Sequence, residues 1–337
     1  MQTSVPLASF TTFHIGGPAR NFIEVTSEED IETALAYARE SGLRLFVLGA
    51  GSNILVSDAG VDGLVMRMQM QGMTFIDGDE QCGIVGGAGM SWDAVVDAAC
   101  ARGLYGIENL AGIPGTLGGA AVQNIGAYGA ELAPVFAYAD VIDSSTSERR
   151  RINIQDAAFT YRGSIFKTRL ELIIVRVALT LQKHGALSTS YADLAHAAAS
   201  GTKLSNPSEV ATAVRGIRAL KFPSGTEEGT AGSFFKNPLI DAAHAADLAT
   251  RFPGLPLFPQ ENGTVKIPLA WILDHVLSLK GYAQGHVRLY EKQPLVIVAE
   301  AGATASDVNA LAHYVADRVK EATHIDIERE VETFGAR

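Results

Sequence analysis

Glycine is concentrated in four short clusters, and these limit the possible folds of the chain more than any other feature of the sequence. They lie at 49–53, 86–89, 112–119 and 126–129. Glycine permits backbone conformations that are closed to other residues, and it lets main-chain N–H groups approach a ligand closely. The third and fourth clusters together exceed what reversal of the chain direction needs. We therefore expect glycine turns whose backbone N–H groups hold an anionic ligand such as a diphosphate.

The first cluster, 49–53, lies between two strand-like apolar runs, 45–48 and 54–56. Ile54 stands where the dinucleotide fingerprint G-x-G-x-x-G has its last glycine, and a strand rather than a helix should follow the turn. An ordinary Rossmann dinucleotide site is therefore excluded here. Taken alone, the cluster is also consistent with a simple tight turn in which Ser52 or Asn53 bonds to its own backbone.

Composition limits the classes of protein and of partner. The chain has 337 residues, with 47% apolar and 19% charged, so we expect a compact fold of two or three domains. Its net charge of −10 provides no basic field for nucleic acid, and we expect no nucleic-acid partner. A small anionic substrate would have to be held by local groups.

Cysteine and histidine indicate neither a disulfide framework nor a metal site. The two cysteines, Cys82 and Cys100, are isolated, and the eight histidines show no metal-ligand spacing. The N-terminus lacks a basic segment followed by an apolar one, and no window approaches about 18 uninterrupted apolar residues. We expect a cytoplasmic protein with no metal and no membrane association.

Periodicity and punctuation predict several helices. A helix over 27–40 should begin with a capping box of Ser27 and Asp30 and stop at Gly42. Further helices are predicted over 92–101, 208–220 and 306–322. The polar stretch 224–230 is the best linker candidate, so a final domain should start near Ala231.

A period-two pattern near the C-terminus predicts a strand over 325–331. Its apolar face would carry Ile325, Ile327 and Val331. Its other face would carry four carboxylates, Asp326, Glu328, Glu330 and Glu332. A row of this kind is usually a solvated strand face, and periodicity alone does not single out one member.

The segments 107–115 and 123–129 closely resemble the FAD-binding signature of the enolpyruvoylglucosamine reductases, and 49–53 resembles the first flavin loop of that family. The resemblance runs from Thr11 to Gly335 with the motifs in the family's order. It implies an α+β fold, with a split FAD-binding domain of the vanillyl-alcohol-oxidase type and a C-terminal α+β substrate-binding domain. The expected bounds are 1–69 and 70–223 for the two FAD-binding subdomains, 224–324 for the substrate-binding domain, and 325–337 for a strand returning to the active site.

The resemblance also implies the cofactors. FAD would be bound non-covalently, since a loop position for His14 is favoured over covalent flavin attachment, and NADPH would be the co-substrate. Ten residues of the glycine clusters would contact FAD: Gly49, Gly51, Ser52, Asn53, Ile113, Pro114, Gly115, Gly118, Gly119 and Gly126.

Three residues would carry the reaction, in which a hydride passes from flavin N5 to C3 of an enolpyruvyl ether and a proton reaches C2. Ser233 matches the family's proton donor, although read in isolation it would be a turn or capping residue. Arg162 matches the arginine that stabilises the enolate; a planar guanidinium suits a carboxylate, whereas the bland alternative is a solvated surface arginine. Glu330 matches the catalytic glutamate of the terminal motif.

Five residues match substrate-binding positions of the family: Tyr191, Arg218, Lys221, Asn237 and Gln293. Tyr191 corresponds to the substrate-loop tyrosine of the family's first class, and Lys221 to a diphosphate ligand, though a lysine at a helix end also complements the helix dipole. The chain departs from many relatives at Gly163, where they carry an acidic residue, and at 285–290. In that second segment, His286 and Arg288 could be new ligands or surface residues.

The substrate implied by the resemblance is UDP-N-acetylglucosamine enolpyruvate, the product is UDP-N-acetylmuramate for peptidoglycan, and the protein is expected to be a monomer. Two other functions stay open from the sequence. One is a flavin oxidase of another hydroxylated substrate, and the other is a non-catalytic nucleotide-sugar sensor. Substrate-dependent NADPH consumption separates the reductase from both.

Overall fold

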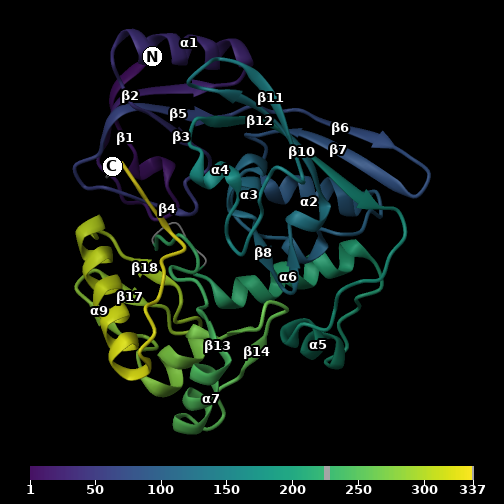
Figure 1. The fold of residues 1–337 in the computed structure, drawn as a ribbon, viewed down its shortest axis with the longest axis vertical. Coiled ribbons are helices and arrows are strands. Elements are labelled where there is room, and N and C mark those ends of the chain that lie inside the picture. The colour runs from purple at the N-terminus through teal and green to yellow at the C-terminus, as the bar shows by residue number, and fades with distance from the viewer. Residues whose placement is uncertain (224–227, 336–337) are drawn as a thin grey trace. The chain divides into compact units, whose positions relative to one another are not determined.

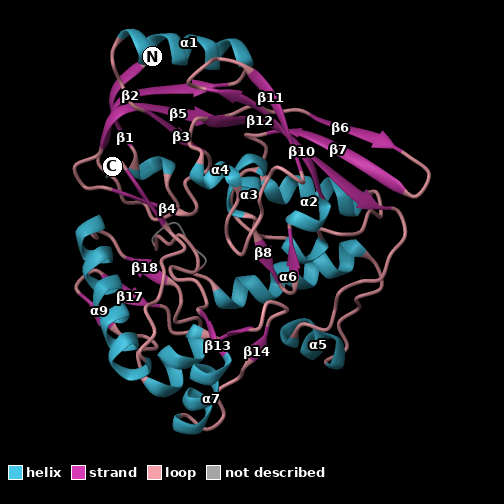
Figure 2. Ribbon diagram, in the orientation of Figure 1, coloured by secondary structure: helices cyan, strands magenta, loops and turns pink. Residues whose placement is uncertain are grey.

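The computed structural model describes residues 1–223 and 228–335. The chain divides into two compact units, each assembled from segments far apart in sequence. The first unit contains Met1–Val5, Ala19–Ala50 and Asp62–Ala219, and the second contains Pro6–Pro18, Gly51–Val61 and the chain from Leu220 onward. Both units mix helices with strands (Figures 1 and 2).

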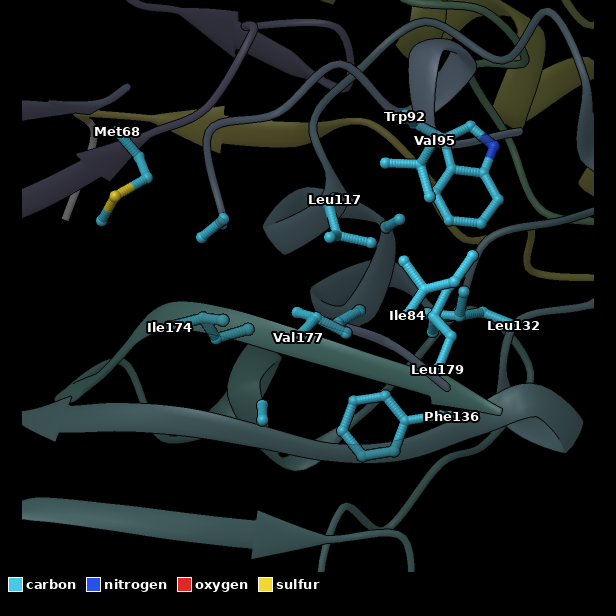
Figure 3. Packing of buried hydrophobic residues seen from close by; sticks show 14 of the residues in the cluster. Met68, Ile84, Trp92, Val95, Leu117, Leu132, Phe136, Ile174, Val177 and Leu179 are labelled. Atoms are coloured by element: carbon cyan, nitrogen blue, oxygen red, sulfur yellow. The ribbon is translucent and has the colours of Figure 1, made fainter. Parts of the chain in front are cut away.

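A five-stranded antiparallel sheet forms the larger part of the first unit. Its strands, in spatial order, are β11 (Arg149–Asn153), β10 (Phe136–Asp143), β12 (Leu172–Gln182), β7 (Gln81–Gly87) and β6 (Met73–Asp77). Trp92 of α2 (Trp92–Ala101) and Leu117 of α3 (Leu117–Gln123) are fully buried in the same core as Ile84 and Val177 of the sheet (Figure 3). This core fixes the starts of α2 and α3, where the glycine clusters lie.

A four-stranded sheet carries the N-terminal part of the first unit. Its spatial order is β1 (Gln2–Pro6), β2 (Pro18–Val25), β5 (Val61–Met68) and β3 (Leu45–Leu48), with β3 and β5 parallel. Helix α1 (Glu28–Glu40) contributes the buried side chains of Ile31 and Leu35 to the core that contains Leu64 and Met66 of β5. The remaining helices and strands of this unit are β8 (Gly126–Ala127), β9 (Ala130–Glu131), α4 (Ile165–Thr168), α5 (Ala192–Ala199) and most of α6 (Pro207–Lys221).

The second unit is built on short strands and one long helix. Its three small sheets are β13 (Leu239–Asp241), β15 (Thr264–Lys266) and β14 (Phe258–Pro259); β16 (Ala283–Gln284), β17 (Val287–Leu289) and β18 (Ile297–Ala299); and the parallel pair β4 (Ile54–Val56) and β19 (Glu332–Phe334). Its helices include α7 (Ala242–Arg251), α8 (Leu269–Trp271), a π-helical turn at Ile272–Val276, and α9 (Ala305–Thr323). Buried residues of α9 share a core with Val287, Leu289 and the aromatic pair Phe234 and Phe235.

All four predicted helices are confirmed. Helix α1 begins directly after its N-cap Ser27, with the predicted capping box of Ser27 and Asp30, and Gly42 beyond its end has a φ of +61°. Helix α2 has the predicted bounds, and α6 and α9 differ from prediction by one residue at each end. The turn at 49–53 joins β3 to the strand β4, as predicted.

Two local predictions need correction or completion. The prediction of a strand over 325–331 is wrong. That segment makes a single isolated bridge, between Arg329 and Phe235, and the regular strand β19 starts only at Glu332. The helix α3 within the third glycine cluster was not predicted, because its glycines were interpreted as turns. The predicted linker at 224–230 lies partly outside the described residues; its part at 229–230 bonds to Ala299 and Thr12.

Candidate active site

Ser233 and Glu330 lie on hydrogen-bonded neighbouring segments of the second unit. The N–H of Glu330 donates to the carbonyl of Phe234, at 2.8 Å, and the N–H of Phe234 donates to the carbonyl of Leu295, at 2.7 Å. The segment that follows Ser233 therefore runs between the segment of Gln293 and the segment of Glu330. Two of the three predicted catalytic residues are brought together in this way.

The first glycine cluster is joined to the Glu330 segment. The side-chain amide of Asn53 donates to the carbonyl of Glu330, at 3.1 Å, and the N–H of Glu332 donates to the carbonyl of Asn53, at 3.0 Å. These bonds continue into the β4–β19 pairing. Asn53, predicted as a flavin ligand, is thus joined by one side-chain and one backbone hydrogen bond to the segment of Glu330, which is predicted as a catalytic residue.

Gln293 and Asn237 are the substrate-binding candidates on the hydrogen-bonded segments of this centre, Gln293 two residues before Leu295 and Asn237 four residues after Ser233. The side-chain oxygen of Gln293 is buried and has no hydrogen-bond partner within residues 1–223 and 228–335. A buried polar atom without a partner costs about 1–3 kcal/mol, so a ligand group that pairs with this amide would be favoured. Asn237 uses its side-chain oxygen to accept from the N–H of Leu269, at 2.9 Å, which leaves its amide nitrogen as the donor toward a ligand.

Arg162 lies in a tight turn of the first unit. Thr160 and Gly163 exchange both backbone hydrogen bonds, and Arg162 has a φ of +56°, an unusual value for a non-glycine residue. Its Nη2 donates to the carbonyl of Gly126, at 2.6 Å. A Cβ at Gly163 would lie 2.5 Å from the hydroxyl oxygen of Thr160, so any larger residue there would require the Thr160 side chain to move.

Tyr191 lies beside the fourth glycine cluster. Its ring contacts that of Tyr128 edge to face, with centroids 5.4 Å apart, and its side chain is 45% exposed. Burial raises the pKa of Tyr128 to about 12, so its hydroxyl stays protonated at neutral pH. The hairpin β8–β9 therefore carries Tyr128 against Tyr191 and presents Gly126 to Arg162.

Lys221 is the last residue of α6, and Arg218 lies one turn earlier. The Nε of Arg218 donates to the carbonyl of Gly112, at 2.9 Å, a contact with the third glycine cluster that was not predicted. Burial lowers the pKa of Arg218, yet the guanidinium stays charged at neutral pH.

The glycine clusters fit a flavin nucleotide in part. A Cβ built at Gly49 would lie 3.0 Å from the hydroxyl oxygen of Thr116, so the first cluster approaches the start of α3 as closely as a glycine allows. Gly51 is buried with a φ of +64°, and its N–H donates no hydrogen bond to any residue that the structure describes. Such an amide is suited to a ligand oxygen.

The predicted roles of Gly118 and Gly119 need qualification. The N–H of Gly118 donates to the carbonyl of Ala88, at 2.9 Å, and that of Gly119 donates to the hydroxyl of Thr116, at 3.1 Å. A Cβ at Gly118 would lie 2.9 Å from that of Ala88. Gly118 is thus needed for close packing, and neither N–H is available to a phosphate. These two hydrogen bonds do not involve the backbone of Ile113, Pro114 or Gly115 at the tip of the cluster.

Arg288, considered as a new ligand, is an ion-pair residue instead. It contacts Glu228 at 2.6 Å and Glu300 at 3.0 Å, and its side chain is 18% exposed. Among the described residues, no group of three or more His, Cys, Asp or Glu side chains could hold a metal ion. None of the described helices is both long enough and apolar enough to span a membrane.

Sequence reasoning missed the residues that support the loops. Asp93 accepts from the N–H of Gly112, at 2.6 Å, and Thr116 caps α3. Asn124, 1% exposed, donates to the carbonyl of Thr160, at 3.0 Å, beneath the Arg162 turn. Thr116 before 117–119 was a recognisable cap signal, whereas no local pattern reveals the other two contacts.

Comparison with known proteins defines the class first. A family model described as an FAD binding domain matches residues 19–152, and one described as the C-terminal domain of UDP-N-acetylenolpyruvoylglucosamine reductase matches residues 224–334. The chain is therefore an FAD-dependent oxidoreductase. The predicted α+β fold with an FAD-binding domain and a C-terminal domain is confirmed.

Whole-chain relatives are more specific. UDP-N-acetylenolpyruvoylglucosamine reductase of Pseudomonas aeruginosa is 37% identical over 98% of both chains, and that of Escherichia coli O157:H7 is 35% identical over 98% of this chain and 96% of that one. The crystal structure of the Thermus caldophilus reductase matches with a TM-score of 0.68 and 25% identity, covering 98% of this chain and 97% of that one. The chain belongs to the UDP-N-acetylenolpyruvoylglucosamine reductase family.

Proposed function

We propose that this chain reduces UDP-N-acetylglucosamine enolpyruvate to UDP-N-acetylmuramate, a peptidoglycan precursor, with NADPH as the reductant. The observation that carries the proposal is the match to reductases of this name along nearly the whole of both chains. The neighbouring positions of Ser233 and Glu330 in the second unit support it independently, since these residues lie 97 positions apart in the numbering yet share a backbone hydrogen-bond network.

The reaction adds a hydride at C3 of the enolpyruvyl group and a proton at C2. FAD, when bound, would supply the hydride chemistry between NADPH and the enolpyruvyl group. Negative charge develops at C2 and on the adjacent carboxylate, so the protein has to stabilise that charge and deliver one proton.

We assign proton delivery at C2 to the Ser233 hydroxyl, with Glu330 acting beside it. Ser233 is partly exposed, and its hydroxyl makes no hydrogen bond to the residues that the structure describes, so it is available to a substrate. The carbonyl of Glu330 accepts from Asn53 while its N–H donates to Phe234, so two bonds fix its backbone. A serine is a weak acid, and the developing charge at C2 is what would draw its proton.

We assign charge stabilisation to Arg162. A guanidinium can bind a carboxylate through two parallel hydrogen bonds. The constrained turn at Thr160–Gly163 and the bond to Gly126 limit the conformations of this side chain, which favours a preorganised role over that of a mobile surface residue. Gln293 would hold the substrate carboxylate through its side-chain NH2 group, whereas its buried, unpaired oxygen would accept from a ligand N–H or O–H.

The UDP end of the substrate would be held by Lys221, Arg218, Tyr191 and Asn237. Lys221 provides a point charge for the diphosphate, and Asn237 has its amide nitrogen available. The exposed ring of Tyr191 is suited to covering a bound ligand. We further propose that the protein acts as a monomer in the cytoplasm on small-molecule substrates.

Steady-state consumption of NADPH tests the proposal. Purified protein carrying FAD should oxidise NADPH rapidly only when the enolpyruvyl sugar nucleotide is present. NADPH oxidation at the same rate without it, driven by oxygen, would instead indicate an oxidase. Binding of the sugar nucleotide without any turnover would indicate a sensor.

A further inference from the structure

The tip of the third glycine cluster, Ile113–Gly115, is suspended between anchors on helix α2. The indole nitrogen of Trp92 donates to the carbonyl of Leu110, at 2.8 Å, and the backbone N–H of Trp92 donates to the carbonyl of Gly115, at 3.1 Å. Trp92 itself is fully buried. The start of α2 therefore holds the chain on both sides of the tip.

Gly112, which directly precedes the tip, is held by hydrogen bonds at both its N–H and its carbonyl group. Its N–H donates to Oδ1 of Asp93, at 2.6 Å, and its carbonyl accepts from Nε of Arg218, at 2.9 Å. Its φ is +69°, and a Cβ would lie 3.2 Å from Cγ of Arg215 and 3.3 Å from Cδ of Arg218. Two side chains of α6 and one of α2 thus determine where this glycine lies.

Asp93 is in turn oriented by Arg215. Nε of Arg215 lies 3.0 Å from Oδ2 of Asp93, and Nη2 lies 2.9 Å from Oδ1, the two-bond geometry typical of arginine and carboxylate. Burial acts to raise the pKa of Asp93, but the hydrogen bonds from Arg215 and Gly112 lower it overall, so the carboxylate is charged at neutral pH. Asp97 makes a second contact with Arg215, and its side chain is 65% exposed.

We propose that Asp93, oriented by Arg215, is a positioning residue that determines how firmly the chain holds FAD; this rests on the proposed contact of the tip at Ile113–Gly115 with FAD. Asp93 fixes the N–H of Gly112, and the orientation of Gly112 determines the direction in which the chain enters the tip at Ile113–Gly115. Without the carboxylate, the N–H of Gly112 loses its partner and the tip gains freedom that FAD binding must then remove. Asp93 would act through its hydrogen bond to Gly112 and not as a catalytic residue.

The rate at which FAD leaves the purified holoprotein tests this inference. Release is followed as the rise of free-flavin fluorescence after dilution into buffer without FAD. Asp93→Ala should accelerate release by about tenfold or more. Asp93→Asn keeps an acceptor for Gly112 but loses the charge that binds Arg215, so its effect should be smaller. Arg215→Met, which leaves Asp93 in place, should also accelerate release.

Asp97→Asn is the matched control, because it removes the other carboxylate on Arg215 and leaves Gly112 untouched. Its rate of FAD release should be within about twofold of the native rate, because an exposed ion pair contributes little stability. Thermal unfolding of each variant after removal of FAD distinguishes positioning from a merely structural role, which would lower the unfolding midpoint without changing release. Native release rates in Asp93→Ala, or in Arg215→Met if Asp93→Ala does not fold, would overturn the inference, as would equal acceleration in Asp97→Asn.

Discussion

Ser233 owes its position to hydrogen bonds made by its neighbours. Phe234 donates to Leu295 and accepts from Glu330, and its ring is fully buried against Phe13 and Phe235. The Ser233 side chain is therefore separable from the scaffold that holds it. A substitution that removes only the hydroxyl should change the chemistry at C2 without displacing the segment.

Ser233→Ala should leave the reduction of FAD by NADPH nearly unchanged and should slow reoxidation by the enolpyruvyl substrate by about 100- to 10,000-fold, because only the second half-reaction uses the proton. Stopped-flow absorbance of the flavin measures both halves. Ser233→Cys, which retains a proton donor, should recover part of the loss. Equal slowing of both half-reactions would remove Ser233 from the role of proton donor.

Lys221→Ala should raise the apparent KM for the sugar nucleotide by about tenfold while kcat changes little, since the lost charge would contribute to binding the diphosphate rather than to the reacting atoms. Initial rates over a range of substrate concentration give both constants. Lys203→Ala, at an exposed position, is the control and should have native constants. An unchanged KM in Lys221→Ala would exclude it from the substrate site.

Helix α1 shows how local signals can determine an element. Oδ2 of Asp30 accepts from the backbone N–H groups of Thr26 and Ser27, and the Ser27 hydroxyl accepts from the N–H of Asp30. Each partner is within four residues, so the cap was predictable from sequence. Hydrogen bonds from Thr26 and Ser27 lower the pKa of Asp30 below 3.8.

Ser27→Ala should lower the free energy of unfolding by about 1 kcal/mol at neutral pH, as loss of a helix N-cap does. Ser41→Ala, at the other end of α1, makes no side-chain cap bond and should have no comparable effect. Urea denaturation measures both variants. If Ser41→Ala is as destabilising as Ser27→Ala, the cap is not the cause.

The same cap gives a prediction about pH. Because folding lowers the pKa of Asp30, its contribution to stability is present above pH 3.8 and is lost as pH falls through the lower, folded-state pKa. The stability difference between the native chain and Asp30→Asn should therefore be constant near neutral pH and vanish in acid. A difference that persists unchanged below the folded-state pKa would contradict this assignment.

The segment 325–331 shows why the prediction of elements fails where long-range contacts decide. Its alternation was real, since Ile325 and Val331 are buried and Asp326 and Glu328 are exposed. A regular strand also needs a continuous partner, and here the neighbouring segment offers one isolated bridge at Phe235. The regular pairing begins only where the chain meets β4. Period-two burial therefore predicted which side chains face the core, but not the hydrogen bonding.

Considered along its full length, the chain is joined by contacts between segments hundreds of residues apart. Asp58 caps α9 through the N–H groups of Ala305 and Ser306, at 2.7 and 3.0 Å, and Asn53 bonds to Glu330. Helix limits and glycine turns were predictable because they depend on neighbours in sequence. The support of Gly112 by Asp93 and Arg218 was not, because nothing in the local pattern pairs residues 19 and 106 positions apart.

The candidate site was predictable to a similar extent. Family motifs supplied Ser233, Arg162 and Glu330, and the structure then showed how the backbone holds each one. It also showed that two predicted flavin ligands, Gly118 and Gly119, have their N–H groups engaged within the protein. That result depends on the packing of α3 against Ala88. The sequence did not predict this packing, because the glycines of α3 indicate turns rather than a helix.

Anaerobic reoxidation of the reduced enzyme by substrate tests the central claim most directly. Holoprotein reduced without oxygen should regain its oxidised flavin absorbance, at about 450 nm, on addition of UDP-N-acetylglucosamine enolpyruvate. Mass spectrometry should then show the lactyl ether in equal amount, heavier than the substrate by the added hydride and proton. Flavin that stays reduced until oxygen is admitted, with the enolpyruvyl ether recovered unchanged, would contradict the proposed function.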